Sequence, residues 1–245
     1  MNALIQAELL KLRTLRSFWW TAVALLAAVP VLVVSNIAVA EDVAGKLNTG
    51  EGVRSVFSAA STPLMLIVGI MLMAGEFRHR TAAGTFLTEP RRRRVVVAKL
   101  IASALVATLL ALASAAVALA VGLPALSAKH VDLPAHAGDI AAALLGSSTA
   151  TVLYALVGVG LGAAIRNQTV AISVALGWSF VVEGALMALA DGAGRWLPGG
   201  AAAALSGGLP QGIDLLPVWA AALLFAAYGF GFAAAGITLI GRRDV

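Results

Sequence analysis

Residues 100–123 read LIASALVATLLALASAAVALAVGL, an apolar run that contains no charged side chain. About 20 apolar residues in a helix cross the hydrocarbon core of a bilayer, so this run predicts a transmembrane helix. The chain of 245 residues is 60% hydrophobic and 12% charged, whereas soluble domains carry about 25% charged residues. Similar runs recur along the whole length and leave no room for a soluble domain. We therefore expect a single transmembrane domain, residues 1–245.

Apolar runs on both sides of this one predict an all-α integral membrane protein with six transmembrane helices. The spans are expected near 18–40, 56–75, 100–123, 140–165, 170–190 and 218–240. The first run is longer than the apolar region of a signal peptide, about 7–15 residues, so we expect it to be retained. Residues 191–217 are apolar in the middle but interrupted by Gly and Pro. This pattern predicts a re-entrant pair of short helices before the last span.

Residues 1–16 predict a helix that lies in the cytoplasmic interface of the membrane. Its apolar side chains gather on one arc of a helix, and they are Met1, Leu4, Ile5, Leu9, Leu12 and Leu15. Lys11, Arg13 and Arg16 would then contact lipid headgroups, and the tryptophans that follow would mark the membrane surface. An ordinary charged flank of the first span remains the alternative.

A basic stretch, residues 76–99, precedes the run at 100–123 and contains seven of the 17 Lys and Arg residues. If this loop, both termini and the turn at Arg166 share one side of the membrane, that side receives thirteen of the 17. The positive-inside rule makes it the cytoplasmic side. A multi-pass protein of a bacterial cytoplasmic membrane is expected. Four consecutive arginines, Arg91, Arg92, Arg93 and Arg94, are expected to fix topology or contact anionic lipid.

Several motifs resemble a known family of membrane proteins. They are GEFRHRT at 75–81, TFLTEPR at 85–91, RVVVAKL at 94–100, ELLKLRTLRS at 8–17 and WLPGGAAAAL at 196–205. Together they resemble ABC-2 type transporter permeases, the six-helix membrane subunits of ATP-binding cassette exporters. The first motif is the most specific of them.

The resemblance implies a transport subunit without an ATPase site of its own. ATP and Mg would be bound by a separate ATP-binding subunit, so no cofactor is expected in this chain. The permease would form a homodimer or a pseudo-symmetric heterodimer and export an amphipathic or hydrophobic substrate, such as a drug, a lipid or a peptide-like molecule. Residues 76–99 would be the coupling loop. Its partner-contacting positions would be Glu76, Phe77, Arg78, His79 and Thr81.

Glu183 is the one ionisable residue expected well inside a span. A carboxyl group there must be hydrated, paired or protonated, so it should face the helix bundle or a water-accessible cavity. Two roles remain open from the sequence, a structural hydrogen bond between helices and a place on the substrate path. An error in the span boundary is a third explanation.

Other function classes fit the sequence less well. The chain has no cysteine and no P-loop motif, which excludes thiolate chemistry and ATP binding by a Walker sequence. His130 and His136 with Asp132 could bind a metal, but a solvated loop is the simpler interpretation. The basic residues flank apolar spans instead of forming a groove with aromatics, so nucleic acid is not an expected partner. A membrane anchor or regulatory subunit, or an intramembrane hydrolase that uses Glu183, remains the alternative.

Overall fold

The computed structural model describes residues 1–42, 46–60, 63–78, 91–189, 192–208 and 215–242, and every regular element among them is helical. Six helical stretches are long and apolar enough to cross a membrane. They are Arg16–Ala40, Gly50–Arg78, Arg93–Ala128, Ala137–Ile165, Gln168–Met187 and Val218–Thr238. The expected all-α membrane protein with six spans is confirmed.

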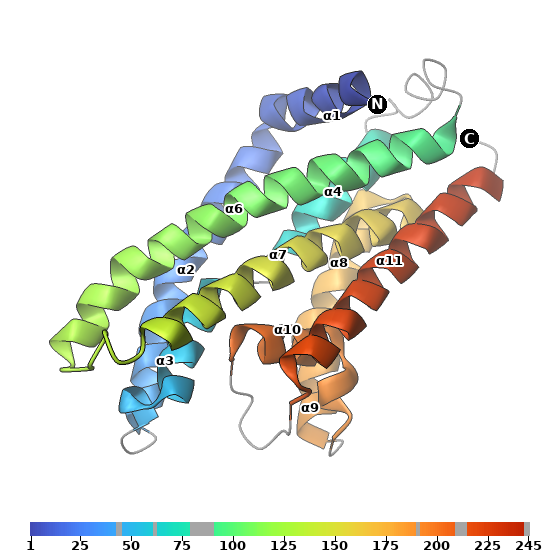
Figure 1. Ribbon diagram of the computed structural model, residues 1–245. Helices are drawn as coiled ribbons and strands as arrows, with labels where there is room; N and C mark the ends of the chain where they lie inside the picture. The colour runs from blue at the N-terminus through green and yellow to red at the C-terminus, as the bar shows by residue number, and fades with distance from the viewer. Residues whose placement is uncertain (43–45, 61–62, 79–90, 190–191, 209–214, 243–245) are drawn as a thin grey trace.

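The chain begins with α1 (Asn2–Thr14), which lies across one end of the molecule beside α6 (Figure 1). The helix ends at Leu15, whose extended backbone (φ −81°, ψ 114°) lets the chain change direction. The long helix α2 (Arg16–Asp42) follows and continues through Pro30. The end of the last helix, α11 (Val218–Arg242), lies at the same end of the molecule as α1. Six crossings are an even number, so α1 and the end of α11 are expected on the same side of the membrane, and the structure places them at the same end of the molecule.

The second span begins earlier than the sequence predicted. It consists of α3 (Gly50–Phe57), the 3₁₀ turn Ser58–Ala60 and α4 (Met65–Arg78). Residues 50–54 were expected in an external loop, but the Thr49 hydroxyl accepts a hydrogen bond from the Gly52 amide at 3.1 Å. This side-chain cap satisfies a free amide of the first turn and starts the helix there.

The third span, α6 (Arg92–Ala128), is longer than expected at both ends. The predicted loop 76–99 is helical at both ends, because its first three residues belong to α4 and its last eight to α6. Arginine is a good helix former, so a helix can start at Arg92. At the other end the helix continues through Pro124, which was expected in a loop.

The fourth span, α7 (Ala137–Ile165), is the centre of the bundle and contacts α3, α4, α6, α10 and α11. Small residues allow the closest of these contacts. A Cβ added to Gly69 of α4 would overlap the Ala155 carbonyl oxygen of α7, and one added to Gly158 of α7 would overlap the Leu66 carbonyl oxygen of α4. Glycine on both faces lets the two backbones meet directly.

The fifth span changes its helix type in the middle. It starts as α8 (Gln168–Leu176), widens into the π-helical segment η3 (Gly177–Val182) and ends as α9 (Glu183–Leu189). In the region expected to hold two re-entrant helices, the described residues 192–208 and 215–217 contain one 3₁₀ turn, Gly194–Trp196, and one α-helix, α10 (Pro198–Ser206). Most residues of α10 are buried, and it packs on α7 and α11.

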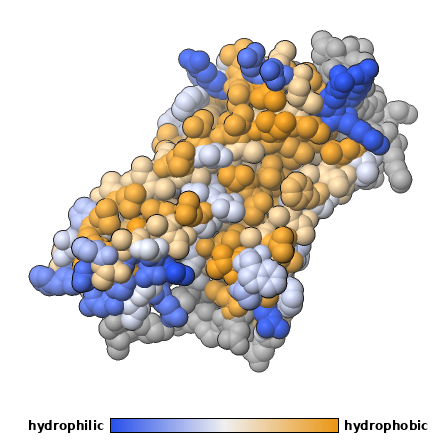
Figure 2. All heavy atoms as spheres, viewed as in Figure 1, coloured by the Kyte–Doolittle hydropathy of each residue, from blue (hydrophilic) through white to orange (hydrophobic). Residues whose placement is uncertain are grey.

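The polarity of the surface changes along the long direction of the helix bundle. Figure 2 shows hydrophobic side chains across the middle of the visible face and hydrophilic ones toward its two ends. Trp19 and Trp20, near the start of α2, are 54% and 74% exposed. An apolar belt between polar ends suits a protein whose middle is solvated by lipid.

Candidate functional site

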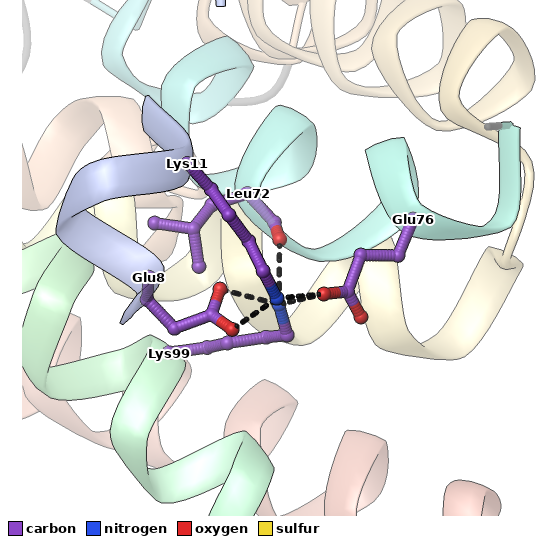
Figure 3. Close-up of polar contacts among 5 residues, drawn as sticks. All are labelled: Glu8, Lys11, Leu72, Glu76 and Lys99. Atoms are coloured by element: carbon purple, nitrogen blue, oxygen red, sulfur yellow. Dashed lines mark hydrogen bonds and ion pairs between the residues drawn. The ribbon is translucent and has the colours of Figure 1, made fainter. Parts of the chain in front are cut away.

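Four ionisable side chains meet at the end of the molecule where both termini lie (Figure 3). Glu8 and Lys11 come from α1, Glu76 from α4 and Lys99 from α6; we refer to them as the charge cluster. Nζ of Lys11 lies 2.7 Å from Oε1 of Glu8 and 2.7 Å from Oε1 of Glu76. Nζ of Lys99 lies 2.6 Å from Oε2 of Glu8 and 3.0 Å from Oε1 of Glu76. Each carboxylate therefore contacts both ammonium groups.

Helical spacing brings these groups together. Glu8 lies one turn before Leu12 on the face of α1 that packs inward, and both residues are buried. Lys11 follows Glu8 by three residues and so shares its side of the helix. On α4, Leu72 lies one turn before Glu76, and its carbonyl oxygen accepts a hydrogen bond from Lys99 at 3.2 Å. The cluster thus joins the main chain of α4 as well as its side chain.

Burial makes the pairing necessary. The side chains of Lys99, Glu8 and Glu76 are 0%, 6% and 8% exposed. Taking a single charge out of water costs several kcal/mol, and only well-placed partners offset that cost. Two carboxylates and two ammonium groups cancel in formal charge, so the cluster is stable as a unit and sensitive to the loss of any member.

Lys11 is the most exposed member, with 42% of its side chain accessible. Burial acts to lower the pKa of its ammonium group, but the hydrogen bonds and charges of Glu76 and Glu8 outweigh burial and raise this pKa above 10.5. Lys11 therefore stays protonated at physiological pH and holds α1 against α4.

A pocket of about 240 Å³ lies next to the charge cluster. Its lining residues come from α1, the start of α2, α4 and α8, and they include Glu8, Lys11, Leu12, Leu15, Met71, Leu72, Glu76 and Gln168. Gln168, the first residue of α8, is 8% exposed and brings the fifth span to the same place. The cluster and pocket therefore join five elements, α1, α2, α4, α6 and α8, at one end of the bundle.

The other expected coupling residues lie around the end of α4. The guanidinium carbon of Arg166, which follows α7, lies 5.6 Å from the centre of the Phe77 ring, a cation–π distance. Arg78 is exposed at the last position of α4. His79 and Thr81 lie outside the described residues. A role of these five positions in binding a partner stays a prediction.

The residues expected at the lipid surface divide into two groups. Arg13, Arg16, Arg91, Arg93 and Arg94 are exposed, and Arg92 is the first residue of α6. Lys11 instead directs its ammonium group to two carboxylates. Lipid contact by the arginines stays a prediction, whereas the charge cluster gives Lys11 a structural role that the sequence did not indicate.

Glu183 lies far from the charge cluster, where η3 meets α9, and is 4% exposed. Its Oε1 accepts a hydrogen bond from Nε1 of Trp178 at 2.8 Å, and its Oε2 accepts one from the amide of Gly199 at 2.8 Å. The π-helical turn brings Trp178 and Glu183, five residues apart, to the same side. Gly199 is in the first turn of α10, so the carboxylate joins the fifth span to α10.

Two of the residues considered as metal ligands, His136 and Asp132, have other contacts. Nδ1 of His136 lies 3.3 Å from Oδ2 of Asp139, whose Oδ1 accepts a hydrogen bond from Arg54 at 2.8 Å. Oδ1 of Asp132 accepts a hydrogen bond from the Ala135 amide at 3.3 Å. Within the described part of the chain, no three His, Asp or Glu side chains are grouped so that they could hold a metal ion.

Sequence reasoning missed two members of the charge cluster, Glu8 and Lys99, and one residue of the adjoining pocket, Gln168. A signal existed for Glu8, because an acid inside the apolar arc of a helix must find a partner when the arc packs. Lys99 was counted with the basic loop, although it follows three valines and an alanine and is buried like Val95, Val96 and Ala98. Nothing in the local sequence marks Gln168.

Two comparisons bear on what this arrangement does. A family model described as "ABC-2 family transporter protein" matches residues 4–184. The matched segment contains all of the charge cluster and reaches Glu183. A search among curated proteins found no match.

Proposed function

The chain belongs to the ABC-2 transporter family and is a membrane-spanning transporter permease, and from this premise we propose that it exports an amphipathic or hydrophobic substrate. A separate ATPase subunit would bind ATP and Mg and supply the energy. Two permease chains would work as a pair with two such subunits. The cytoplasmic side would be the end of the molecule that holds α1 and both termini.

The observation that carries this proposal is the charge cluster. It ties α1 to the last turn of α4 and the first turns of α6, the two helices that flank residues 79–90. A partner that displaces this segment would therefore move two spans and the interfacial helix together. The ATPase can drive such a change only if its two states contact the permease differently.

Coupling would begin at the exposed end of α4 and continue through buried contacts. Arg78 is available to a partner, whereas Glu76, two residues earlier, is held by Lys11 and Lys99. Arg78 would accordingly bind the ATPase, and Glu76 would transmit its displacement. In this scheme the contact between Phe77 of α4 and Arg166 holds the turn between α7 and α8 against the end of α4.

Co-purification with a co-expressed ATPase subunit tests the division of roles. Arg78→Ala is expected to weaken association about tenfold, equivalent to about 1.4 kcal/mol, without changing the thermal stability of the permease. Glu76→Gln keeps the shape of the side chain but removes one charge of the cluster. It is expected to lower substrate-stimulated ATP turnover while association persists.

Arg13→Ala, at an exposed residue of α1, is the matched control. Unchanged association and unchanged ATP turnover in both Arg78→Ala and Glu76→Gln would rule out the coupling role. ATP-dependent uptake of a hydrophobic dye into inverted vesicles then separates an exporter from a membrane anchor, because an anchor would support ATP hydrolysis without uptake.

A further inference from the structure

A second pocket, of about 300 Å³, is lined in part by residues of α9 and α10. These two helices lie in the half of the molecule remote from α1 (Figure 1). Its walls come from the second span, α7, the fifth span and α10. The residues used below are Ser58, Pro63, Glu183, Met187, Ala202 and Ser206. Its volume is at the small end of the range of about 300–1,000 Å³ for ligand sites.

Among the described residues that line the pocket, Glu183 is the one Asp or Glu, and none is Lys, Arg or His. Both of its oxygens accept an N–H bond, from Trp178 and from Gly199. No basic side chain among the described residues pairs with it, so its carboxyl group has no protein counter-charge in the pocket.

The hydroxyl groups of the pocket add acceptors. The Ser206 hydroxyl donates to the Ala202 carbonyl oxygen at 2.9 Å, and the Ser58 hydroxyl donates to the Ser55 carbonyl oxygen at 2.7 Å. Once its proton is used, a hydroxyl oxygen can only accept a further hydrogen bond. The Ser206 oxygen and the Glu183 carboxyl group are therefore suited to a ligand that donates hydrogen bonds and carries positive charge.

We propose that this pocket binds the ammonium group of an amphipathic organic cation. The ammonium group would lie against Glu183 and donate to the Ser206 oxygen, while the apolar part of the ligand packs on Pro63, Met187 and Ala202. A buried carboxylate without a counter-charge is costly in a membrane protein. The ligand supplies that charge, and a neutral molecule of the same shape does not.

The inference rests on the proposed transport function, because it narrows the substrate from amphipathic molecules in general to cationic ones. It can nevertheless be tested without transport. Binding is measured on the purified full-length chain in phosphatidylcholine nanodiscs, with no ATPase subunit and no ATP present. Failure of binding would contradict the cation site alone, whereas failure of transport with binding intact would contradict the exporter.

Octylammonium and octanol are the probes, and equilibrium dialysis with empty nanodiscs corrects for uptake into lipid. Octylammonium is expected to bind the wild-type chain at least roughly tenfold more tightly than octanol, a difference of about 1.4 kcal/mol. Equal affinity for the two probes would overturn the proposal. This comparison uses the unaltered protein and depends on no variant.

The variant Glu183→Gln tests whether Glu183 causes the preference for octylammonium over octanol. It is expected to abolish the preference for octylammonium and leave octanol binding unchanged, whereas Glu51→Gln, at an exposed acid of α3, should change neither. A preference that survives in Glu183→Gln would overturn the proposal. If Glu183→Gln does not fold, Ser206→Ala serves instead and is expected to weaken octylammonium binding several-fold, and full affinity in that variant would overturn the proposal.

Discussion

At the scale of single residues, Lys99 is the member of the charge cluster on which the others depend most. Its ammonium group contacts both carboxylates, and its side chain is wholly buried. Lys99→Met fills similar space but leaves two buried carboxylates with one ammonium group. Breaking a buried ion pair on one side costs about 3–5 kcal/mol, so the unfolding midpoint of the purified permease should fall well below that of the wild type.

Arg94→Met is the control, because Arg94 is exposed one turn and one residue earlier on the same helix. It should leave the midpoint nearly unchanged. An equal midpoint for Lys99→Met and wild type would mean that the cluster does not hold the helices together.

The stability that Lys11 contributes to the protein should depend on pH, and the direction of this dependence can be derived. Hydrogen bonds to Glu76 and Glu8 outweigh its burial and raise its folded-state pKa above 10.5. A raised pKa means that the stabilisation is complete below pH 10.5 and is lost as the pH rises through the folded-state value. The stability difference between wild type and Lys11→Met should therefore be constant at lower pH and shrink above it.

Unfolding midpoints of the two proteins, measured from neutral pH upward past 10.5, test this expectation. A difference that already shrinks between neutral pH and 10.5 would show that the ammonium of Lys11 is not stabilised by its carboxylate partners.

At the scale of secondary-structure elements, α10 is held by a close approach to α7. A Cβ on Gly146 would overlap the Leu205 carbonyl oxygen of α10. Gly146→Ala should force the helices apart and destabilise the protein by about 1–3 kcal/mol. Gly138→Ala, near the start of α7, meets nothing within 4 Å and is the matched control. Similar unfolding midpoints for the two variants would contradict this contact between α7 and α10.

The elements also show how far the sequence could predict the structure. Apolar runs located all six spans, because the length of a membrane-spanning helix is set by the bilayer. Their ends were less predictable, since Thr49 as a cap and the helix-forming arginines of α6 act locally and were not recognised. The charge cluster joins partners separated by 65 and 91 residues, Lys11 to Glu76 and Glu8 to Lys99. No local pattern predicts such pairs.

Glu183 shows the same limit. Its depth in a span predicted that it needed a partner, but two explanations remained open. The π-helical turn that brings Trp178 beside it, and the start of α10 that donates the Gly199 amide, depend on packing among the fifth span and its neighbours. The sequence therefore indicated which residue required an explanation and not what surrounds it.

At the scale of the whole molecule, the proposed topology places α1 and both termini in the cytoplasm and the end of α6 outside. The chain has no cysteine, so single cysteines can be introduced without removing others. Gln6 on α1 and Ser127 near the end of α6 are both exposed. In intact cells a membrane-impermeant maleimide should label Ser127→Cys and not Gln6→Cys, and permeabilisation should make both reactive. If only Gln6→Cys were labelled in intact cells, the orientation would be the reverse of the proposed one. The charge cluster would then lie outside the cell, where a cytoplasmic ATPase could not reach it.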